Sequence, residues 1–274
     1  MASTVHRVSR DRPSSTVLHA FGVDGPARRL AGGQGTSWAV DDVVLKPDGG
    51  ALHEWLADAF ADVTSHAFRL AAPVRTRDGA WCVQGWSATR WVQGAEPDYS
   101  AVSTWQEILT AGRAFHRAVS HLPRPTFLDT HRDWWAQADR VAWGERAVRF
   151  VPEFAALARR LWEALQPLGR PQLVHADLTQ NVLFNPGRPP AIIDISPYWR
   201  PPAYAEGIVV ADALCWHDAP SSVWKTVDVS AAAVARALLF RMATTNERVL
   251  SGCEAIDVLD EARRYGLAAA AIGL

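Results

Sequence analysis

The sequence is poor in cysteine and contains no long hydrophobic run. Its three cysteines, Cys82, Cys215 and Cys253, lie far apart, and none belongs to a CxxC pair. We therefore expect reduced, buried thiols and no disulfide framework. No apolar stretch approaches the roughly 18 residues of a membrane span, and the N-terminus lacks the apolar core of a secretory signal. These absences predict a cytoplasmic protein with no membrane partner.

The sequence also lacks a net excess of positive or negative charge, and it lacks the common nucleotide-binding motifs. A formal net charge of −1 over 274 residues gives no electrostatic reason to expect a nucleic-acid partner. The Gly-rich segment 32–35 is not followed by the Gly-Lys-Ser/Thr of a Walker loop, and it lacks the third glycine of a dinucleotide fingerprint. Residues 85–89, Gly-Trp-Ser-Ala-Thr, do not form the Gly-x-Ser-x-Gly elbow of a serine hydrolase.

The N-terminal third alternates short strand-like runs with turn residues. Residues 1–26 show little periodicity and are expected to include a loosely held arm. The apolar spacing after Gly50 predicts one helix, and Arg77-Asp78-Gly79 is the expected turn of a hairpin. Together these patterns predict a small antiparallel sheet of about five strands, drawn from residues 28–31, 36–40, 42–46, 68–75 and 80–91.

Helical periodicity replaces the strand pattern after the Gly94–Pro97 stretch. Apolar residues recur at spacings of three and four from Val102 to Val119 and again from Phe154 to Leu165. Further helices are expected over about 204–219, 227–249 and 254–270. We predict two domains in an α+β chain: a β-rich nucleotide-binding lobe, residues 1–94, and a mainly helical lobe, residues 95–274, which carries the catalytic loop and an acceptor site.

The Gly-rich turn and the lysine after it are candidate phosphate ligands. Between two strands, the bare backbone at Gly33 and Gly35 permits close approach to phosphates, and Ser37 adds a hydroxyl. A flexible hairpin explains the turn equally well. Lys46 ends the strand-like run Val43–Leu45 in a chain with few other lysines, and its placement suits a cation that reaches the α- and β-phosphates. A lysine at a strand end is more often a solvated surface residue.

Such a lysine often needs a carboxylate on the following helix. Glu54 is the nearest candidate, although it falls opposite the apolar stripe of that helix. Asp58 and Asp62 are the other choices.

Four polar residues follow or separate apolar strand-like runs in the middle of the chain. His175 and Asp177 come at the end of one run, Asn181 follows in the same loop, and Asp194 closes the run Ala191–Ile193. Acids next to buried strands demand a cation, a proton partner or several hydrogen bonds. A polar turn with a structural histidine is the alternative. Two carboxylates and an amide are what magnesium-dependent phosphoryl transfer requires.

The segment His175–Asn181 together with Ile193-Asp194 resembles the signature of the aminoglycoside phosphotransferase/choline kinase-like superfamily, which is related to the protein kinases. The resemblance covers roughly residues 28–220 and is close to small actinobacterial members. It implies a protein-kinase-like two-lobe fold. It further implies the following roles: Asp177 as catalytic base, Asn181 and Asp194 as Mg²⁺ ligands, Lys46 as phosphate clamp, His175 as the brace of the loop, and Trp91 and Val92 in the hinge that meets the adenine of ATP.

Two features depart from the family pattern. Ala176 stands where many relatives have glycine, and Asn181 follows Asp177 by four residues where five is commoner. The segment Ile195-Ser196-Pro197 after Asp194 lacks the Phe-Gly of protein kinases. That difference argues against a phosphorylation-controlled activation segment.

The combined hypothesis is an ATP- and Mg²⁺-dependent phosphotransferase acting on a hydroxyl of a small molecule such as an aminoglycoside, amino sugar, sugar or related metabolite. The alternative is a nucleotide-binding regulator with a kinase-like fold that has lost catalysis. The sequence does not indicate the oligomeric state. Acidic residues of the C-terminal third offer either a site for a cationic acceptor or solvated helix faces: Glu206, Asp212, Asp218, Glu254, Asp257, Asp260 and Glu261.

Overall fold

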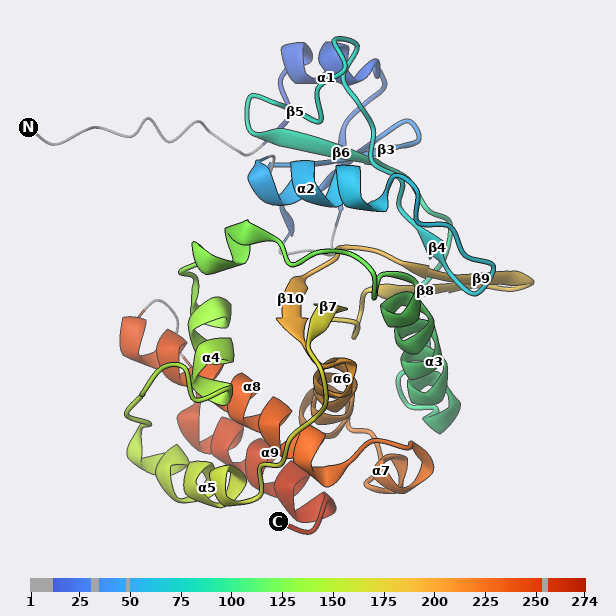
Figure 1. Ribbon diagram of the computed structural model, residues 1–274. Helices are drawn as coiled ribbons and strands as arrows, with labels where there is room; N and C mark the ends of the chain where they lie inside the picture. Colours follow the sequence, from blue (N-terminus) through green and yellow to red (C-terminus); the bar gives the residue numbers. More distant parts are fainter. Residues whose placement is uncertain (1–11, 31–34, 48–49, 253–255) are drawn as a thin grey trace, which may run out of the picture. The chain divides into compact units, whose positions relative to one another are not determined.

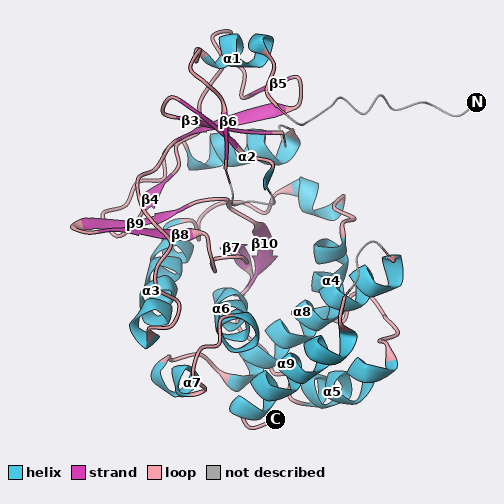
Figure 2. Ribbon diagram, turned by 180° about the vertical axis from the view of Figure 1, so that it is seen from behind, coloured by secondary structure: helices cyan, strands magenta, loops and turns pink. Residues whose placement is uncertain are grey.

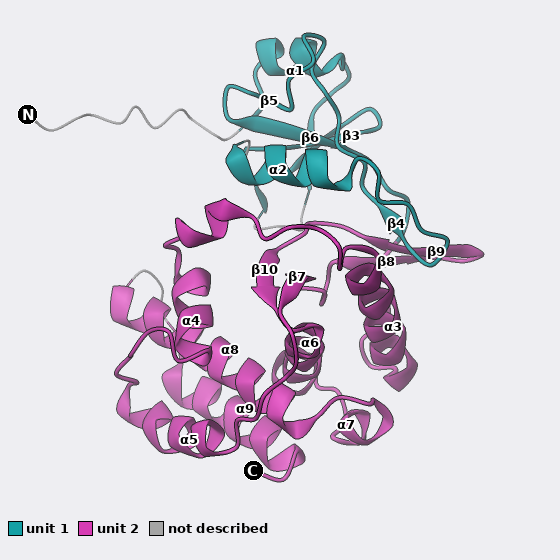
Figure 3. Cartoon of the chain, viewed as in Figure 1, with its two compact units in different colours: residues 1–94 teal, residues 95–274 magenta. Residues whose placement is uncertain are grey.

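The chain forms two compact units, residues 1–94 and 95–274 (Figure 3). A computed structural model describes residues 12–30, 35–47, 50–252 and 256–274. The boundary lies between Gly94 and Ala95, where strand-rich sequence gives way to helical sequence. The functions expected of the two units stay predictions.

The N-terminal unit contains a five-stranded antiparallel sheet in the order β1-β2-β3-β6-β5 (Figure 1). Alternation along β3 buries Val43 and Leu45, which pack with Trp86 of β6 in the core of this unit. The helix predicted after Gly50 is present as α2. The elements are β1 Arg28–Arg29, β2 Trp38–Val40, β3 Val43–Lys46, α2 Ala51–Phe60, β4 Arg69–Leu70, β5 Cys82–Val83 and β6 Trp86–Arg90.

A short helix replaces part of the expected N-terminal arm. Helix α1 spans Ser15–Phe21, and the hydroxyl of Ser14 caps it by accepting the N–H of Val17. Val17 and Phe21 are buried and belong to the core of the sheet. Gly22 ends the helix with a φ of 72°, a left-handed conformation that glycine adopts readily. Seven residues are too few to show a helical period, so the sequence did not indicate this helix; residues 1–11 of the expected arm lie outside the described residues.

The predicted hairpin turn at residues 77–79 is a turn, but it does not join two long strands. The N–H of Thr76 donates to the Ala80 carbonyl at 2.8 Å, which closes the turn locally. Before it, only an isolated bridge at Pro73 connects the expected strand 68–75 to Thr89 of β6. Two hydrogen bonds flank this bridge, from the N–H of Val74 to the Ala88 carbonyl at 2.9 Å and from the N–H of Arg90 to the Ala72 carbonyl at 2.7 Å, so the bridge does not need an N–H from Pro73. The hairpin of the sheet instead joins β5 and β6 through Gln84 and Gly85, both with positive φ.

The long helix α8 lies at the centre of the C-terminal unit, in contact with α4, α5, α6 and α9 (Figure 1). Ser230 caps its start and Gly252, in the left-handed region, ends it. Helix α4 was not predicted. The helices of this unit are α3 Val102–Ala118, the 3₁₀ turn Thr126–Asp129, α4 Trp134–Ala142, α5 Pro152–Glu163, α6 Pro202–Trp216, α7 Ser222–Thr226, α8 Ala231–Ser251 and α9 Val258–Ala271.

Two antiparallel strand pairs accompany these helices (Figure 2). Strands β7 and β10 pair with His175 opposite Pro197, and β8 and β9 form a hairpin with Val182 opposite Ile192. The strands are β7 Gln172–His175, β8 Val182–Asn185, β9 Arg188–Ile192 and β10 Pro197–Arg200.

Helix α6 is apolar around most of its circumference and is correspondingly buried. Nevertheless, within the part of the chain that the structure describes, no helix is long and apolar enough to cross a membrane.

The crossing of α6 and α8 depends on Gly207. A Cβ added there would lie 2.3 Å from the carbonyl oxygen of Ala233 on α8. Both helix backbones would have to separate, because no flexible side chain can yield at this contact.

We expect Gly207→Ala to lower the unfolding free energy by about 1–3 kcal/mol, measured by denaturant titration. The control is Gly266→Ala in α9, where an added Cβ meets nothing within 4 Å. That change should stabilise the protein by up to about 1 kcal/mol through helix propensity. Equal stability of the two variants would contradict a close helix crossing at Gly207.

Candidate active site

The loop between β7 and β8, residues 176–181, is held against the C-terminal unit by its own apolar residues. Leu178 is buried, and its side chain occupies the space beside Gly112 of α3, where an added Cβ would lie 2.4 Å from Leu178 Cδ1. The N–H of Asn181 donates to the Leu178 carbonyl at 3.0 Å, and Gln180 has a φ of 66°. The left-handed residue lets this short loop turn directly into β8.

His175 connects three backbone segments through its buried ring. Its Nδ1 accepts the N–H of Asp177 at 3.2 Å and that of Ser196 at 3.3 Å. Its Nε2 lies 3.2 Å from the Ile193 carbonyl oxygen. Because Nδ1 acts only as an acceptor here, the ring is the neutral tautomer whose Nε2 donates to Ile193. The imidazole therefore holds the loop, the end of β9 and the start of β10 together.

A second buried histidine supports the first from helix α3. The Nε2 of His116 accepts the backbone N–H of His175 at 3.2 Å. Burial lowers the pKa of His116 to about 3, and the proximity of His175 acts in the same direction. The imidazole therefore stays neutral and keeps the lone pair that this hydrogen bond requires.

Asp177 and Asn181 are in direct contact despite the short spacing between them. The amide Nδ2 of Asn181 donates to the Asp177 carbonyl oxygen at 2.7 Å and lies 3.3 Å from its carboxylate Oδ2. The Asp177 side chain is 44% exposed. Because Nδ2 is the atom engaged with Asp177, the other amide atom of Asn181, Oδ1, is left as an oxygen ligand.

Asp194 follows Ile193, whose N–H donates to the carbonyl oxygen of Asn181 at 3.0 Å. Its φ of 49° is a conformation that aspartate tolerates better than most residues, and its side chain is exposed. An amide oxygen and a carboxylate are hard donors of the kind that Mg²⁺ binds. The described residues contain no cluster of three His, Cys, Asp or Glu side chains that could hold a metal. Mg²⁺ commonly needs only one or two carboxylates beside phosphate oxygens, so Asn181 and Asp194 fit that ion.

Arg241 of α8 was not identified from the sequence, although it contacts the predicted base. Its Nη2 donates to Asp177 Oδ1 at 3.1 Å. It also pairs with the buried Asp212 of α6, from Nε at 2.8 Å and from Nη2 at 2.6 Å. Burial alone would lower the pKa of Arg241, but the charges of Asp212 and Asp177 outweigh it and the net shift is upward. Burial raises the pKa of Asp212, and the guanidinium opposes that shift.

A local signal for this pair exists in the sequence. Arg241 interrupts the apolar run 237–243, and Asp212 interrupts the apolar run 207–215. A lone charge inside such a run predicts a buried partner of opposite sign, because unpaired charges are not buried.

The predicted phosphate ligands lie in the N-terminal unit. Lys46 ends β3 in register with Ser87 of β6. Ser37 is buried, and its carbonyl oxygen accepts the Leu30 N–H at 2.9 Å. Gly35 has a φ of 66°, and its carbonyl oxygen accepts a hydrogen bond from the Arg29 side chain. Gly33 lies outside the described residues.

The remaining nucleotide candidates are exposed or half-buried. Glu54 is exposed on α2 and makes no ion pair with a described residue. Asp58 accepts Trp81 Nε1 at 2.8 Å and faces Arg75 at 3.8 Å, so it has other partners. The carboxylate partner of Lys46 stays a prediction.

Trp91 is 43% exposed, and its N–H donates to the Asp42 carbonyl oxygen at 2.7 Å. Val92 beside it is half-buried. Their assignment to the adenine site also stays a prediction.

Solved structures with a similar fold come from two groups of enzymes. An aminoglycoside phosphotransferase from Alicyclobacillus acidocaldarius is 16% identical with a TM-score of 0.57, over 91% of this chain and 89% of that one. A choline/ethanolamine kinase family protein from Mesorhizobium loti is 17% identical with a TM-score of 0.55, over 92% and 90%. A thermostable mutant of the aminoglycoside phosphotransferase APH(4)-Ia, in ternary complex with AMP-PNP and hygromycin B, is 15% identical with a TM-score of 0.57, over 94% and 96%.

At such low sequence identity, the structural similarity establishes the fold alone. The fold is α+β and protein-kinase-like, as predicted. No curated protein matches the chain. The model of the phosphotransferase enzyme family matches residues 30–196, more than half of the sequence. The chain therefore belongs to the phosphotransferase enzyme family, within the aminoglycoside phosphotransferase/choline kinase-like superfamily predicted from the His175–Asn181 loop.

Proposed function

We propose that the protein transfers the γ-phosphate of ATP, with Mg²⁺, to a hydroxyl group of a small molecule. The observation that carries this proposal is the half-exposed carboxylate of Asp177, whose two oxygens are held by Arg241 and Asn181. Membership of the phosphotransferase enzyme family supports the reaction class.

Asp177 is the proposed proton acceptor. A hydroxyl that donates a hydrogen bond to its exposed carboxylate is oriented for attack on the γ-phosphorus. As the acceptor oxygen bonds to phosphorus, the bond to the β,γ-bridging oxygen breaks and ADP leaves. The proton of the hydroxyl passes to Asp177 and from there to solvent.

Asn181 Oδ1 and the Asp194 carboxylate are the proposed Mg²⁺ ligands. A bound Mg²⁺ neutralises negative charge on the β- and γ-phosphates during transfer. The hydrogen bond between Ile193 and Asn181 keeps the two ligand-bearing positions adjacent in the backbone. The Asn181–Asp177 contact ties the metal ligand to the base, so that the short loop serves both roles.

The N-terminal unit supplies the proposed nucleotide contacts. Lys46 is assigned to the α- and β-phosphates, and the backbone at Gly33 and Gly35 with the Ser37 hydroxyl to the phosphate chain. Trp91 and Val92 are assigned to the adenine. Glu54 is proposed as the carboxylate that fixes Lys46. AMP-PNP in the APH(4)-Ia complex supports nucleotide use by this fold.

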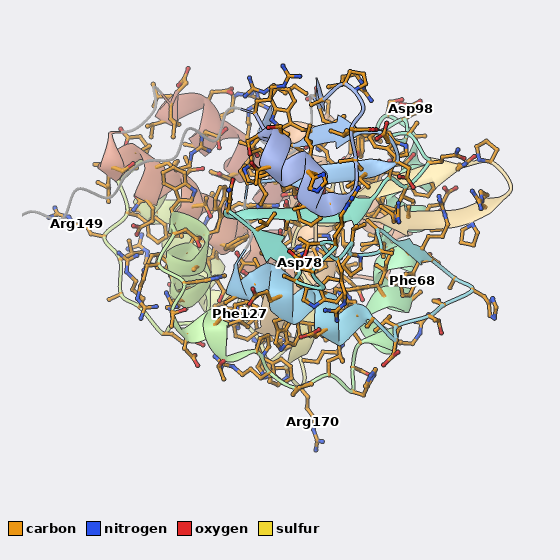
Figure 4. All side chains as sticks on the ribbon, turned by 90° about the horizontal axis from the view of Figure 1, so that it is seen from above. Phe68, Asp78, Asp98, Phe127, Arg149 and Arg170 are labelled. Carbon is orange, nitrogen blue, oxygen red and sulfur yellow. The ribbon has the colours of Figure 1, made fainter. Side chains whose placement is uncertain are left out.

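The acidic residues of the C-terminal third are largely committed within the protein. Arg113 binds Glu206 at 2.6 Å, Arg241 binds Asp212, and Arg264 binds Asp260. Asp257 caps α9. Arg149 and Arg170, in contrast, project from the surface (Figure 4).

With these carboxylates already paired or capping, the acceptor need not be a polycation. The proposed acceptor class therefore includes neutral sugars and related alcohols as well as amino sugars. Hygromycin B in the APH(4)-Ia complex supports a hydroxylated small molecule as substrate of the fold.

We expect the protein to bind MgATP in calorimetry and to transfer labelled γ-phosphate to a member of a panel of sugars, amino sugars and amino alcohols. Asp177→Asn should reduce kcat by roughly 10²- to 10⁴-fold, the contribution of a general base. It should leave MgATP affinity and thermal stability near those of the unchanged protein. MgATP binding without turnover across the panel would favour a regulator that has lost catalysis.

Asn181→Ala and Asp194→Asn should each raise the Mg²⁺ concentration for half-maximal turnover by roughly tenfold or more, because each removes an oxygen ligand. Asp218→Asn is the matched control, since Asp218 is exposed and has a φ of 47°, close to that of Asp194. A Mg²⁺ dependence shared by all three variants would contradict the assignment.

Lys46→Met should weaken MgATP binding by about tenfold or more, the usual effect of losing a charge-assisted hydrogen bond. Lys225, exposed on α7, is the other lysine of the sequence and provides the control Lys225→Met. Calorimetry that gives both variants the affinity of the unchanged protein would remove Lys46 from the nucleotide site.

A further inference from the structure

Arg241 and Asn181 hold the two carboxylate oxygens of Asp177 from different directions. Arg241 Nη2 lies 3.1 Å from Oδ1, and Asn181 Nδ2 lies 3.3 Å from Oδ2. Asn181 belongs to the same loop, whereas Arg241 comes from the centre of α8. Two donors on separate elements restrict rotation of a carboxylate more than either one does alone.

Arg241 is itself fixed before it reaches Asp177. Asp212 binds the guanidinium through both carboxylate oxygens, at 2.8 Å and 2.6 Å. The Arg241 and Asp212 side chains are 14% and 5% exposed. The guanidinium carbon lies 5.3 Å from the ring centre of Phe240 and 6.0 Å from that of Trp216, which limits the space around it.

The backbone supports the same geometry. Asp212 lies on α6 and Arg241 on α8, and these helices approach closely at Gly207. The tight crossing sets the distance between the helices that the two side chains must span.

A buried ion pair is weak evidence for stability, because desolvation offsets much of the attraction. The exposure of the two side chains indicates a role other than stability. The guanidinium is mostly buried, whereas the carboxylate of Asp177 that it contacts is 44% exposed. Arg241 thus holds Asp177 from the protein interior and leaves part of the carboxylate open to solvent.

We propose that Arg241, anchored by Asp212, is a positioning residue that orients the Asp177 carboxylate toward the hydroxyl of the acceptor. The inference rests on the proposed function and deepens it. Asp212 has no part in the chemistry; it fixes the guanidinium and balances its charge. Arg241 holds Asp177 throughout the reaction, including the moment at which the hydroxyl proton passes to the carboxylate.

The chain offers a matched control for the loss of a buried ion pair. Arg200 of β10 binds Asp139 at 2.7 Å, with side chains 15% and 9% exposed. It also pairs with Glu145, so that it too holds two carboxylates. Both of these carboxylates lie outside the catalytic loop, so Arg200→Lys disturbs a comparable pair without touching Asp177.

The experiment measures steady-state kinetics with MgATP and the acceptor found in the panel of sugars, amino sugars and amino alcohols. It compares four variants with the unchanged protein: Arg241→Lys, Arg241→Ala, Asp212→Asn and Arg200→Lys. Misplacement of a catalytic group by about 1 Å costs up to roughly a hundredfold in rate. We therefore expect kcat to fall about tenfold to a hundredfold in the Arg241 variants and less in Asp212→Asn, with the KM for MgATP unchanged within about twofold. Arg200→Lys should keep its kcat per folded molecule even where its melting temperature falls.

Chemical rescue separates positioning from general structural support. Added guanidinium ion or methylguanidine at millimolar concentration should restore part of the kcat of Arg241→Ala without raising its melting temperature. The same additives should not raise the reduced kcat of Asp177→Asn. If Arg241→Ala does not fold, Arg241→Lys and Asp212→Asn carry the comparison.

Three results overturn the proposal: a normal kcat in Arg241→Lys, a kcat loss equal to that of Arg200→Lys, or a change confined to the KM of the acceptor. The last would make Arg241 a substrate ligand. Failure of the proposed function gives a different result, since the unchanged protein would then transfer no phosphate to any acceptor and Arg241 would have no base to position.

Discussion

One neutral imidazole carries the geometry of the candidate site. The ring of His175 receives two backbone N–H groups at Nδ1 and reaches a carbonyl oxygen at Nε2, so three segments of chain meet on it. Protonation of Nδ1 would remove the acceptor for two of those bonds at once. The loop that carries Asp177 therefore depends on the lone pair of this Nδ1, and His116 supports the same residue by accepting its backbone N–H.

A second ordering principle is the pairing of partly buried arginines with carboxylates in the C-terminal unit. Arg113, Arg200 and Arg241 each bridge elements that are distant in sequence. Their net contribution to stability is small when intact, but removal of one partner leaves an uncompensated buried charge. The formal net charge of −1 conceals this arrangement, because a sum over the sequence does not record which charges meet. Arg241 differs from the other two because its pair extends to the loop that holds the proposed base.

The predictable part of the site was the part that is local in sequence. The residues from His175 to Asn181 lie within one loop, so their order alone indicated a family, which the family model confirmed. The kinase-like α+β fold was confirmed for the same reason, since strand and helix patterns are local. Arg241 lies 64 residues from Asp177 and 29 from Asp212, and no spacing rule connects positions that far apart.

Errors at the level of secondary structure had equally local causes. The run 68–75 met β6 around Pro73 alone, and the hairpin closed at Gln84-Gly85, where both residues have positive φ, instead of at residues 77–79. Helix α1 was missed because its seven residues span barely two turns. The nucleotide contacts of Lys46, Glu54, Trp91 and Val92 stay predictions.

The contact at Gly207 has an evolutionary consequence. Helices that touch through side chains can drift apart or together as those side chains change size, and their partners adapt by small steps. Helices that touch through bare backbone have no such intermediate steps, because even one methyl group meets a carbonyl oxygen at 2.3 Å. Descendants of this chain should therefore exchange aliphatic residues freely along α6 and α8 while position 207 stays closed to every side chain. A glycine retained at this position would keep the distance between α6 and α8 that the ion pair of Asp212 and Arg241 requires.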